Sequence, residues 1–179
     1  MTPAEGPPVR SARAQEIVDA ARVLLEQEGL EAVSMRRVAD RLGIRAPSLY
    51  EHLPNKAALE AALISAGFAE WAEAAESAIE EGGAHALAAL ADVYRRFATV
   101  HPHLYRLMTE RPLPRDELEP GVEERAARPV VAAAGGDPDL ARAFWAFAHG
   151  MAVNELNGRF PAGADLDAAW RRGVEAFAR

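Results

Sequence analysis

Apolar residues recur at intervals of three and four along most of the chain, the spacing that places them on one face of an α-helix. The first such run ends before Gly29, a residue type that commonly closes a helix. A second run, barely two turns long, begins after Ser34, whose hydroxyl can cap a helix, and ends at Gly43. A third begins near Pro47 and must end before Pro54, which disfavours helical geometry in the preceding residue. The pattern therefore predicts three short helices in quick succession.

The longest run begins after Asn55, a good capping residue, and continues to about Glu81. Its apolar face changes direction along the helix. The first stripe comprises Leu59, Ala62, Leu63 and Ala66, and the second, rotated by about 140°, comprises Ile64, Phe68, Trp71, Ala75 and Ile79. One helix with two buried faces predicts a connector between an N-terminal module and a larger C-terminal bundle.

The rest of the chain predicts further helices. We expect them over about 87–98, 104–108, 120–134, 138–157 and 165–178, with a proline-rich loop at 111–120. Pro129 is expected to interrupt and kink the third of these segments. Because no segment alternates with the period of two that is typical of strands, the expected fold class is all-α.

Composition supports this fold class and excludes several chemistries. Alanine accounts for 40 of 179 residues and aromatic residues for 7%, which favours packed helices over sheets. The absence of cysteine excludes disulfides, thiolate zinc sites and cysteine nucleophiles. The first 20 residues lack a signal-peptide core and no apolar run reaches about 18 residues, so we expect a soluble, cytoplasmic protein without a membrane partner.

The distribution of charge points to a polyanionic partner. A net charge of −7 by itself weighs against nucleic acid. Residues 34–56, however, hold five cations and two carboxylates, a net charge of +3, so the remainder carries −10. The cations are Arg36, Arg37, Arg41, Arg45 and Lys56. Positive charge concentrated in one short segment is what binding to phosphates requires.

The same segment carries a helix-turn-helix pattern. Two short helices that cross steeply need a small residue at the crossing, a glycine in the turn and apolar anchors beyond it. Ala39, Gly43, Ile44 and Leu49 occupy these places. Because the cations lie in and beside these two helices, the pattern and the charge together favour DNA binding.

Residues 13–65 closely resemble the DNA-binding domain of TetR-type transcriptional regulators. The match lies in SMRRVADRLGIRAPSLYEHLPNKAALEAAL and in the preceding helix, AQEIVDAARVLLEQEGLEAV. The resemblance implies phosphate contacts by Ser34, Arg36, Tyr50, His52 and Lys56, and positions at base edges for Arg45, Ala46, Pro47 and Ser48. The expected domains are a disordered arm at 1–9, a three-helix helix-turn-helix DNA-binding domain at 10–55, and a C-terminal ligand-binding and dimerisation bundle at 56–179.

The chemistry of these residues agrees with such roles and leaves some alternatives open. Arg45 can present its forked guanidinium to two acceptors of a guanine, and phosphate contact suits it almost as well. Glu51 departs from the expected pattern, because a carboxylate repels phosphates unless it accepts a hydrogen bond from cytosine or pairs with Arg45. Arg37 and Arg41 could instead form a solvated helix face, and Tyr50 could be a packed aromatic residue.

The C-terminal bundle resembles one TetR subgroup in a short Trp-His-Gly signature formed by Trp145, His149 and Gly150. The helix that carries it and the last helix have wide apolar stripes, which require burial on two sides. We therefore expect a homodimer that binds a pseudo-palindromic operator of double-stranded DNA. The expected interface comprises Trp145, Ala152, Leu156, Ala169, Trp170, Gly173, Val174 and Phe177.

The family resemblance also implies a cavity for an unknown small-molecule effector within the bundle. Its expected lining is Phe68, Trp71, Tyr94, Phe97, His101, Tyr105, Met108 and His149, although aromatic residues at helical spacing are often simply core. His101 and His103 flank Pro102 without an acidic partner at ligand spacing or a third histidine, so neither a metal site nor a cofactor is predicted.

The alternative function is a helical-bundle small-molecule-binding protein or enzyme whose N-terminal domain is only structural. No Glu-x-x-His, Gly-x-Ser-x-Gly or Walker glycine motif occurs, and a single histidine on an apolar face offers no nucleophile or second base. We therefore predict no catalytic residue and favour a ligand-responsive repressor.

Overall fold

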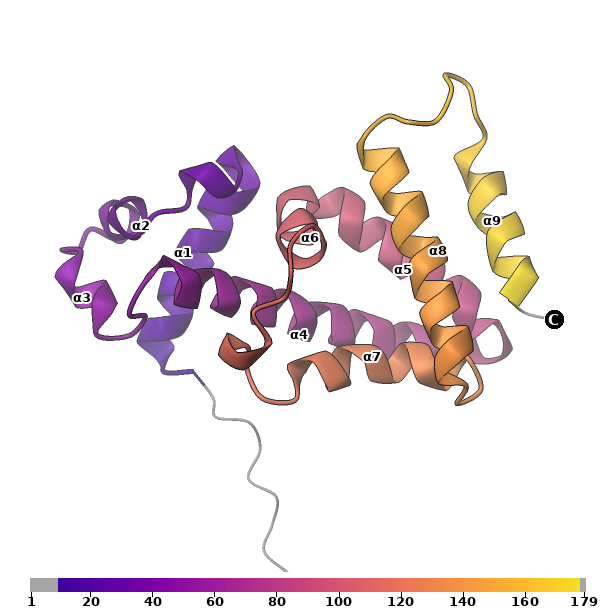
Figure 1. Ribbon diagram of the computed structural model, residues 1–179, viewed down its shortest axis with the longest axis horizontal. Helices are drawn as coiled ribbons and strands as arrows, with labels where there is room; N and C mark the ends of the chain where they lie inside the picture. The colour runs from indigo at the N-terminus through magenta and orange to yellow at the C-terminus, as the bar shows by residue number, and fades with distance from the viewer. Residues whose placement is uncertain (1–9, 178–179) are drawn as a thin grey trace, which may run out of the picture. The chain divides into compact units, whose positions relative to one another are not determined.

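The computed structural model describes residues 10–177, so the predicted disordered arm at 1–9 lies outside the described range. The described residues form helices and no strand (Figure 1), which confirms the all-α class. The helices are α1 (Ala12–Glu28), α2 (Met35–Leu42), α3 (Pro47–Tyr50), α4 (Lys56–Gly82), α5 (Ala86–Val100), α6 (Pro102–Thr109), α7 (Val122–Ala133), α8 (Pro138–Leu156) and α9 (Leu166–Phe177). None of these described helices is long and apolar enough to cross a membrane.

The chain forms two compact units whose first boundary falls inside α4. Unit 1 joins the chain up to Phe68 with His103–Val122, and unit 2 joins Ala69–Pro102 with the chain from Glu123 onward. The long connecting helix that the pattern predicts is therefore α4, with its first half in unit 1 and its second half in unit 2. The sequence analysis expects a DNA-binding domain at 10–55 and a ligand-binding and dimerisation bundle at 56–179. Those domains are defined by function, whereas the two units are defined by contacts, so the expected domain boundary stays a prediction.

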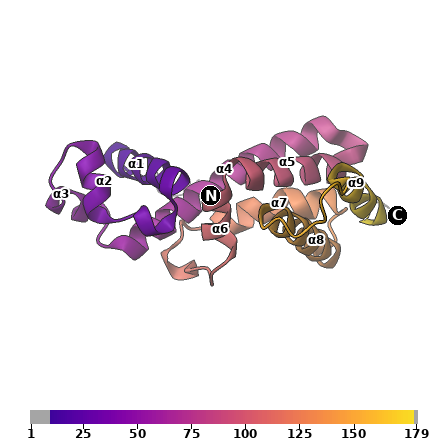
Figure 2. The ribbon, with the colours of Figure 1, turned by 90° about the horizontal axis from the view of Figure 1, so that it is seen from above.

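Local signals fix the helix boundaries of unit 1. The Ser34 hydroxyl accepts a hydrogen bond from the Arg37 amide at 3.3 Å, and the Asn55 side chain accepts one from the Ala58 amide at 2.8 Å. Both are the predicted N-caps. α1 and α2 lie side by side (Figures 1 and 2). The fully buried side chains of this unit include Ile17, Leu25, Val38, Leu49, Leu59 and Leu63.

Unit 1 also contains α6, which approaches α4 closely at Gly67. A Cβ atom added at Gly67 would lie 2.5 Å from Met108 Sδ and 2.9 Å from Leu104 Cδ2, so a larger residue would force these two side chains to move. The start of α6 is held by α1, because the Leu104 amide donates to Glu26 Oε1 at 3.1 Å. The segment 103–122 is thereby packed against the elements that precede it in unit 1.

Unit 2 is built around α5, which packs against both α8 and α9 (Figure 2). α9 comes close to α8 at Gly173, where an added Cβ atom would overlap the Phe147 ring. Phe147 also lies against Trp170 and Phe177, with ring centroids 5.7 and 5.6 Å apart. Gly173, which the sequence analysis expects at the dimer interface, thus has its close contact within a single protomer.

One predicted helix differs from the pattern. α7 continues through Pro129 without the expected interruption. Pro129 is among the fully buried side chains, and this burial offsets the backbone hydrogen bond that proline cannot make. α3 ends at Tyr50, within the limit that Pro54 sets, and the Leu53 amide donates to the Leu49 carbonyl at 2.9 Å.

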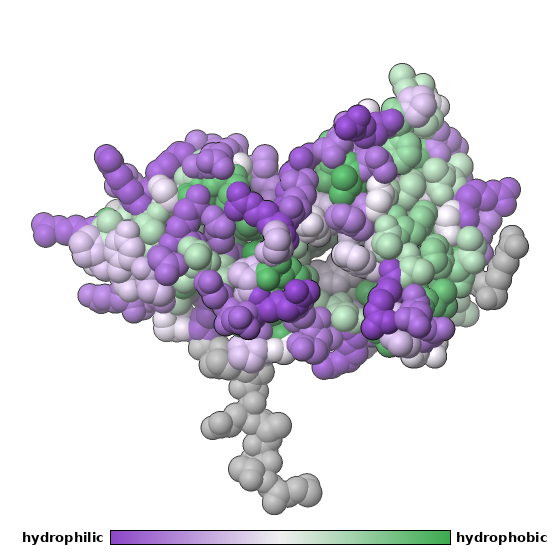
Figure 3. Space-filling model, viewed as in Figure 1, coloured by the Kyte–Doolittle hydropathy of each residue, from purple (hydrophilic) through white to green (hydrophobic). Residues whose placement is uncertain are grey.

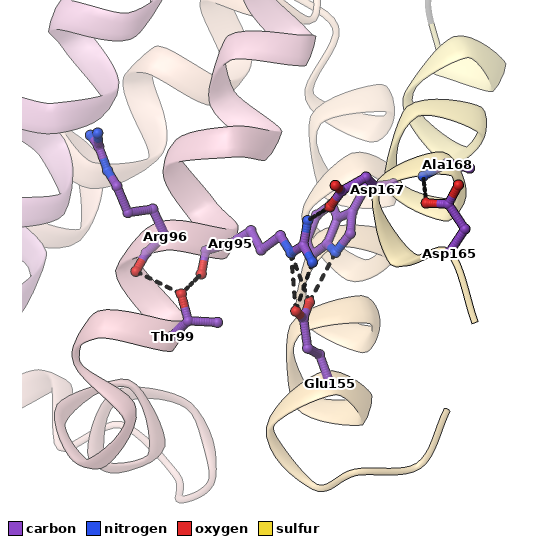
Figure 4. A network of polar contacts seen from close by, with 8 residues as sticks. Arg95, Arg96, Thr99, Glu155, Asp165, Asp167 and Ala168 are labelled. Atoms are coloured by element: carbon purple, nitrogen blue, oxygen red, sulfur yellow. Dashed lines mark hydrogen bonds and ion pairs between the residues drawn. The ribbon is translucent and has the colours of Figure 1, made fainter. Parts of the chain in front are cut away.

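A polar network ties three helices of unit 2, α5, α8 and α9, together at Arg95 (Figure 4). Arg95 lies on α5, and its guanidinium donates to both carboxylate oxygens of Glu155 on α8 at 2.8–3.1 Å. It also binds Asp167 on α9. The Trp170 indole donates to the same Glu155 carboxylate at 3.2 Å. A planar guanidinium can serve two carboxylates at once, so Arg95 fixes α8 and α9 relative to α5.

This network predicts a pH-dependent stability. The hydrogen bond from Arg95 lowers the pKa of Asp167, and the positive charge of Arg95 adds to this. A lowered pKa stabilises the fold while the carboxyl is ionised, above its unfolded value of about 3.9, and this stabilisation is lost as pH falls through the lower folded value. Asp167→Asn should therefore lower the melting temperature at neutral pH, and the difference from wild type should shrink as pH falls from about 5 to 3. Thermal unfolding followed by circular dichroism measures this.

Asp92→Asn is the matched control, because Asp92 is an exposed carboxylate on α5 outside this network. A difference for Asp167→Asn that stays constant across the pH range would contradict the role of the ionised pair.

The contact at Gly173 predicts a cost for adding one methyl group. In an open helix, glycine to alanine stabilises by about 1 kcal/mol. Gly173→Ala should instead lower the free energy of unfolding by about 1–3 kcal/mol, because the new Cβ displaces the Phe147 ring. Chemical denaturation at fixed protein concentration measures the loss. Phe147→Leu in the Gly173→Ala background should recover part of it, and no recovery would show that the ring is not the obstacle.

Candidate nucleic-acid interface

The turn between α2 and α3 has the geometry that the helix-turn-helix pattern predicts. Gly43 closes α2 with φ 65° and ψ 29°, a left-handed conformation that favours glycine. Its amide bonds back toward Asp40, and the Ile44 amide donates to the Ala39 carbonyl at 3.0 Å. The chain thus leaves α2 at a fixed angle and enters α3 four residues later.

The orientation of α3 is set by one buried side chain. Leu49 is 0% exposed, and Leu53 just beyond the helix is also buried. The neighbours Ser48 and Tyr50 are exposed, with Tyr50 at 50%. Tyr50 therefore faces solvent, and the alternative that it is a packed aromatic residue is wrong.

The residues expected to contact DNA are accessible as a set. Exposed side chains are found at Arg36, Arg45, Pro47, Ser48, Tyr50, His52 and Lys56, and half-buried ones at Ser34 and Ala46. Ser34 already serves as the cap of α2. The α2–α3 segment therefore presents cations and hydroxyl groups to solvent on a module anchored by apolar residues, which is a surface suited to phosphate and base contacts.

The cations of this surface differ in how firmly they are held. Arg37 donates to Glu28 Oε1 at 2.6 Å, and this contact raises the pKa of Arg37 and lowers that of Glu28. Arg36 has Asp40 at 3.9 Å, with both side chains largely exposed. Arg37 is thus paired with a residue of α1, which favours the alternative that Arg37 does not contact DNA.

Glu51 stays unexplained in part. Glu51 is exposed, and among the described residues it forms no ion pair with Arg45. Of the two ways to offset its charge beside phosphate, the pair with Arg45 is therefore absent, and a hydrogen bond from cytosine is the other.

A buried polar cluster in unit 1 has no counterpart in the sequence analysis. The Arg10 guanidinium donates to the Ala62 carbonyl at 2.8 Å and pairs with Glu119 Oε1 at 2.8 Å. The Glu119 amide donates to the buried Ser65 hydroxyl at 3.0 Å, and Ser65 donates to the Ala61 carbonyl at 2.9 Å. Except for Ser65 and Ala61, these partners are more than 50 residues apart, and no local pattern signals such pairs. The cluster fixes the start of α1 to α4.

The residues expected to line an effector cavity are divided between the units. Phe68, Tyr105 and Met108 belong to unit 1, and Trp71, Tyr94, Phe97, His101 and His149 belong to unit 2. Trp71 packs edge-on against Tyr94 and Phe97, with ring centroids 5.3 and 6.2 Å apart, and its indole donates to the Ala126 carbonyl at 3.1 Å. These three are buried core residues of unit 2.

His101 and His149 have other surroundings. His101 Nε2 lies 3.1 Å from a Glu70 carboxylate oxygen, and His149 stacks on Trp145 with centroids 5.5 Å apart. Among residues 10–177, no three histidine or acidic side chains gather as a metal site would need.

Unit 2 does contain a half-open cavity of about 1050 Å³. α5, α9, the turn before α5 and the end of α7 line it, with Arg95 and Asp167 on its wall. None of the eight expected lining residues contributes to it, so the effector site that they define stays a prediction.

The residues expected at a dimer interface fall into two groups. Ala152, Trp170 and Val174 are buried within the single protomer, because α8, α9 and α5 pack together there. They belong to the core of the protomer rather than to a free face. Trp145 is 50% exposed, whereas Leu156, Ala169, Gly173 and Phe177 are half-buried. Figure 3 shows a hydrophobic area over α8 and α9.

The fold and the exposed cationic module define a helix-turn-helix regulator class of protein, and comparisons identify the family. Residues 17–63 match the family model described as bacterial regulatory proteins, tetR family. Residues 87–177 match the model described as tetracyclin repressor-like, C-terminal domain. The chain therefore belongs to the TetR family of transcriptional regulators, which confirms the resemblance and excludes the enzyme alternative. Its assignment to the Trp-His-Gly subgroup stays a prediction.

Individual relatives agree with this assignment. An HTH-type transcriptional regulator of Mycobacterium tuberculosis is 30% identical over 154 residues, 80% of this chain and 70% of the relative. The HTH-type transcriptional regulator YobS of Bacillus subtilis is 36% identical over 90 residues, so the match spans 50% of this chain and 47% of YobS. The solved structure of multidrug binding protein EbrR complexed with imidazole has a TM-score of 0.68 at 26% identity, over 93% of this chain and 95% of that one.

Proposed function

We propose that this TetR-family chain is a ligand-responsive repressor that binds a pseudo-palindromic DNA operator as a homodimer. The observation that carries the proposal is the burial of Leu49, which leaves the rest of α3 and the nearby cations exposed. A helix held by one inward residue can enter a major groove while its other side chains meet bases and phosphates.

The contacts divide by chemistry. Arg45, Ala46, Pro47 and Ser48 lie at the entry to α3, where a recognition helix reads base edges. Tyr50, His52 and Lys56 follow on the exposed side and suit phosphate oxygens, as does Arg36 on α2. Arg45 supplies the forked donor that distinguishes guanine.

An effector is the second part of the proposal. The related EbrR structure is described as a multidrug binding protein in complex with imidazole, which supports a small-molecule effector for this chain. A ligand shifts the equilibrium only if it binds the DNA-free conformation more tightly than the DNA-bound one. The residues of unit 2 proposed to line the effector site are Trp71, Tyr94, Phe97, His101 and His149.

The dimer is the third part. α8 presents the half-exposed Trp145, which is stacked on His149. Large exposed aromatic residues are typical anchors of protein interfaces. A symmetric pair of protomers buries this face on both copies and supplies two recognition helices for the two operator half-sites.

The DNA contacts predict distinct effects for three substitutions. Tyr50→Ala and Lys56→Ala should weaken binding to all duplexes alike, and Lys56→Ala should reduce the dependence of log affinity on log salt by about one. Arg45→Ala should instead relax discrimination at one base pair, by about 1–3 kcal/mol. The operator is first selected from a randomised duplex pool, and binding is then measured by fluorescence anisotropy at several salt concentrations.

Arg37→Ala is the matched control, since it removes the same charge from a side chain already paired with Glu28. Losses equal to those of the control for all three substitutions would contradict the contact assignment.

The α8 face predicts a dimer that one charge can disrupt. Wild-type protein should sediment as a dimer, and Trp145→Glu should yield folded monomers, because a carboxylate cannot be buried unpaired at the interface. Arg128→Glu, an exposed change on α7, should leave the dimer intact. Analytical ultracentrifugation with circular dichroism measures both. A wild-type monomer at micromolar concentration would contradict the proposed assembly.

A further inference from the structure

One carboxylate in unit 1 lies between a proposed DNA contact and a distant arginine. Glu60, one turn into α4, has Lys56 Nζ at 3.5 Å from Oε1 and a guanidinium nitrogen of Arg111 at 3.6 Å from Oε2. The Glu60 side chain is 20% exposed, whereas Lys56 and Arg111 are 44% and 58% exposed. The carboxylate is therefore the fixed member of the group, and the two cations are the mobile ones.

We propose that Glu60 restrains Lys56 as its counter-ion and that Arg111 weakens this restraint by sharing the same carboxylate. The inference deepens the proposed function and rests on it, because it concerns the Lys56 contact to phosphate. Glu60 and Arg111 are positioning residues that act through Lys56 and need no contact with DNA themselves.

The physical basis is competition for one ammonium group. Lys56 approaches a phosphate only by giving up part of its attraction to Glu60, so a stronger pair reduces its contribution to binding. A second cation on the other oxygen of Glu60 satisfies part of the negative charge and releases Lys56. Exposed pairs of this kind change an equilibrium by up to about fivefold.

The position of Arg111 is set by α6. α6 is packed against α4 at Gly67, where even one methyl group would collide with Met108 and Leu104. Arg111 follows two residues after α6 ends at Thr109. Arg111 and Glu60 are thereby held within the same unit.

Single substitutions test the charge relation with opposite expected signs. The probe is a fluorescent duplex of about 20 base pairs with no selected sequence, because phosphate contacts need no operator. Glu60→Gln should tighten binding about two- to fivefold and steepen its salt dependence. Arg111→Gln should weaken binding by a similar factor, and Arg111→Lys should retain wild-type affinity.

Controls separate this effect from net charge. Glu80 lies on α4 like Glu60, so Glu80→Gln removes the same charge and is the control for Glu60→Gln. Arg128→Gln removes an exposed cation from α7 and is the control for Arg111→Gln. Circular dichroism confirms that each variant is folded. Glu60→Gln no tighter than Glu80→Gln would overturn the proposal.

Double variants decide the mechanism. In the Glu60→Gln background, Arg111→Gln should have no effect beyond that of Arg128→Gln, because the shared carboxylate is gone. A loss that persists in full would show that Arg111 contacts DNA directly, and would overturn the proposal.

Lys56→Gln should abolish the gain from Glu60→Gln. If Lys56→Gln alone leaves affinity and salt dependence unchanged, the Lys56 contact of the proposed function fails. If Lys56→Gln weakens binding but Glu60→Gln does not tighten it, the Lys56 contact with phosphate stands and the inference about Glu60 fails.

Discussion

The structure of the exposed α2–α3 surface depends on the burial of Leu49. A helix of four residues has too few hydrogen bonds to persist alone, so α3 exists because its one apolar side chain is packed into unit 1. The same contact decides which side chains remain outside. Pro47, Ser48 and Tyr50 face solvent as a consequence of where Leu49 points, and a recognition surface results from a packing constraint.

Acidic neighbours then select among the cations. The chain carries a net charge of −7, and Arg36, Arg37 and Lys56 each have a carboxylate within 4 Å. The pairs differ in kind: Glu28 holds Arg37 by a short hydrogen bond, whereas the contacts of Arg36 and Lys56 are longer. A short hydrogen-bonded pair is costly to exchange for a phosphate, and a loose one is easily exchanged. Arg41 and Arg45 form no ion pair among the described residues, which leaves them the most readily available cations of residues 34–56.

Features set by neighbouring residues could be predicted from the sequence, and features set by distant ones could not. Ser34 and Asn55 cap the helices that follow them, and Gly43 ends α2. Each acts on residues a few positions away, so the helix-turn-helix and the start of α4 could be predicted from local rules. The Arg10–Glu119 pair joins positions more than 100 residues apart and has no signature in either segment. Pro129 illustrates the converse case, in which burial in the fold overrides a local rule that predicts a break.

The apolar stripes of the last helices show a second limit of periodicity. A stripe indicates that a face is buried but not which partner covers it, and Ala152, Trp170 and Val174 are covered by the protomer's own helices. What stays uncovered is concentrated on α8 at Trp145. In a two-fold dimer the same patch contributes twice, so an interface centred on α8 places its strongest anchor beside the symmetry axis. α9 is held to α5 through Arg95 and Asp167, so it supports α8 from within the protomer.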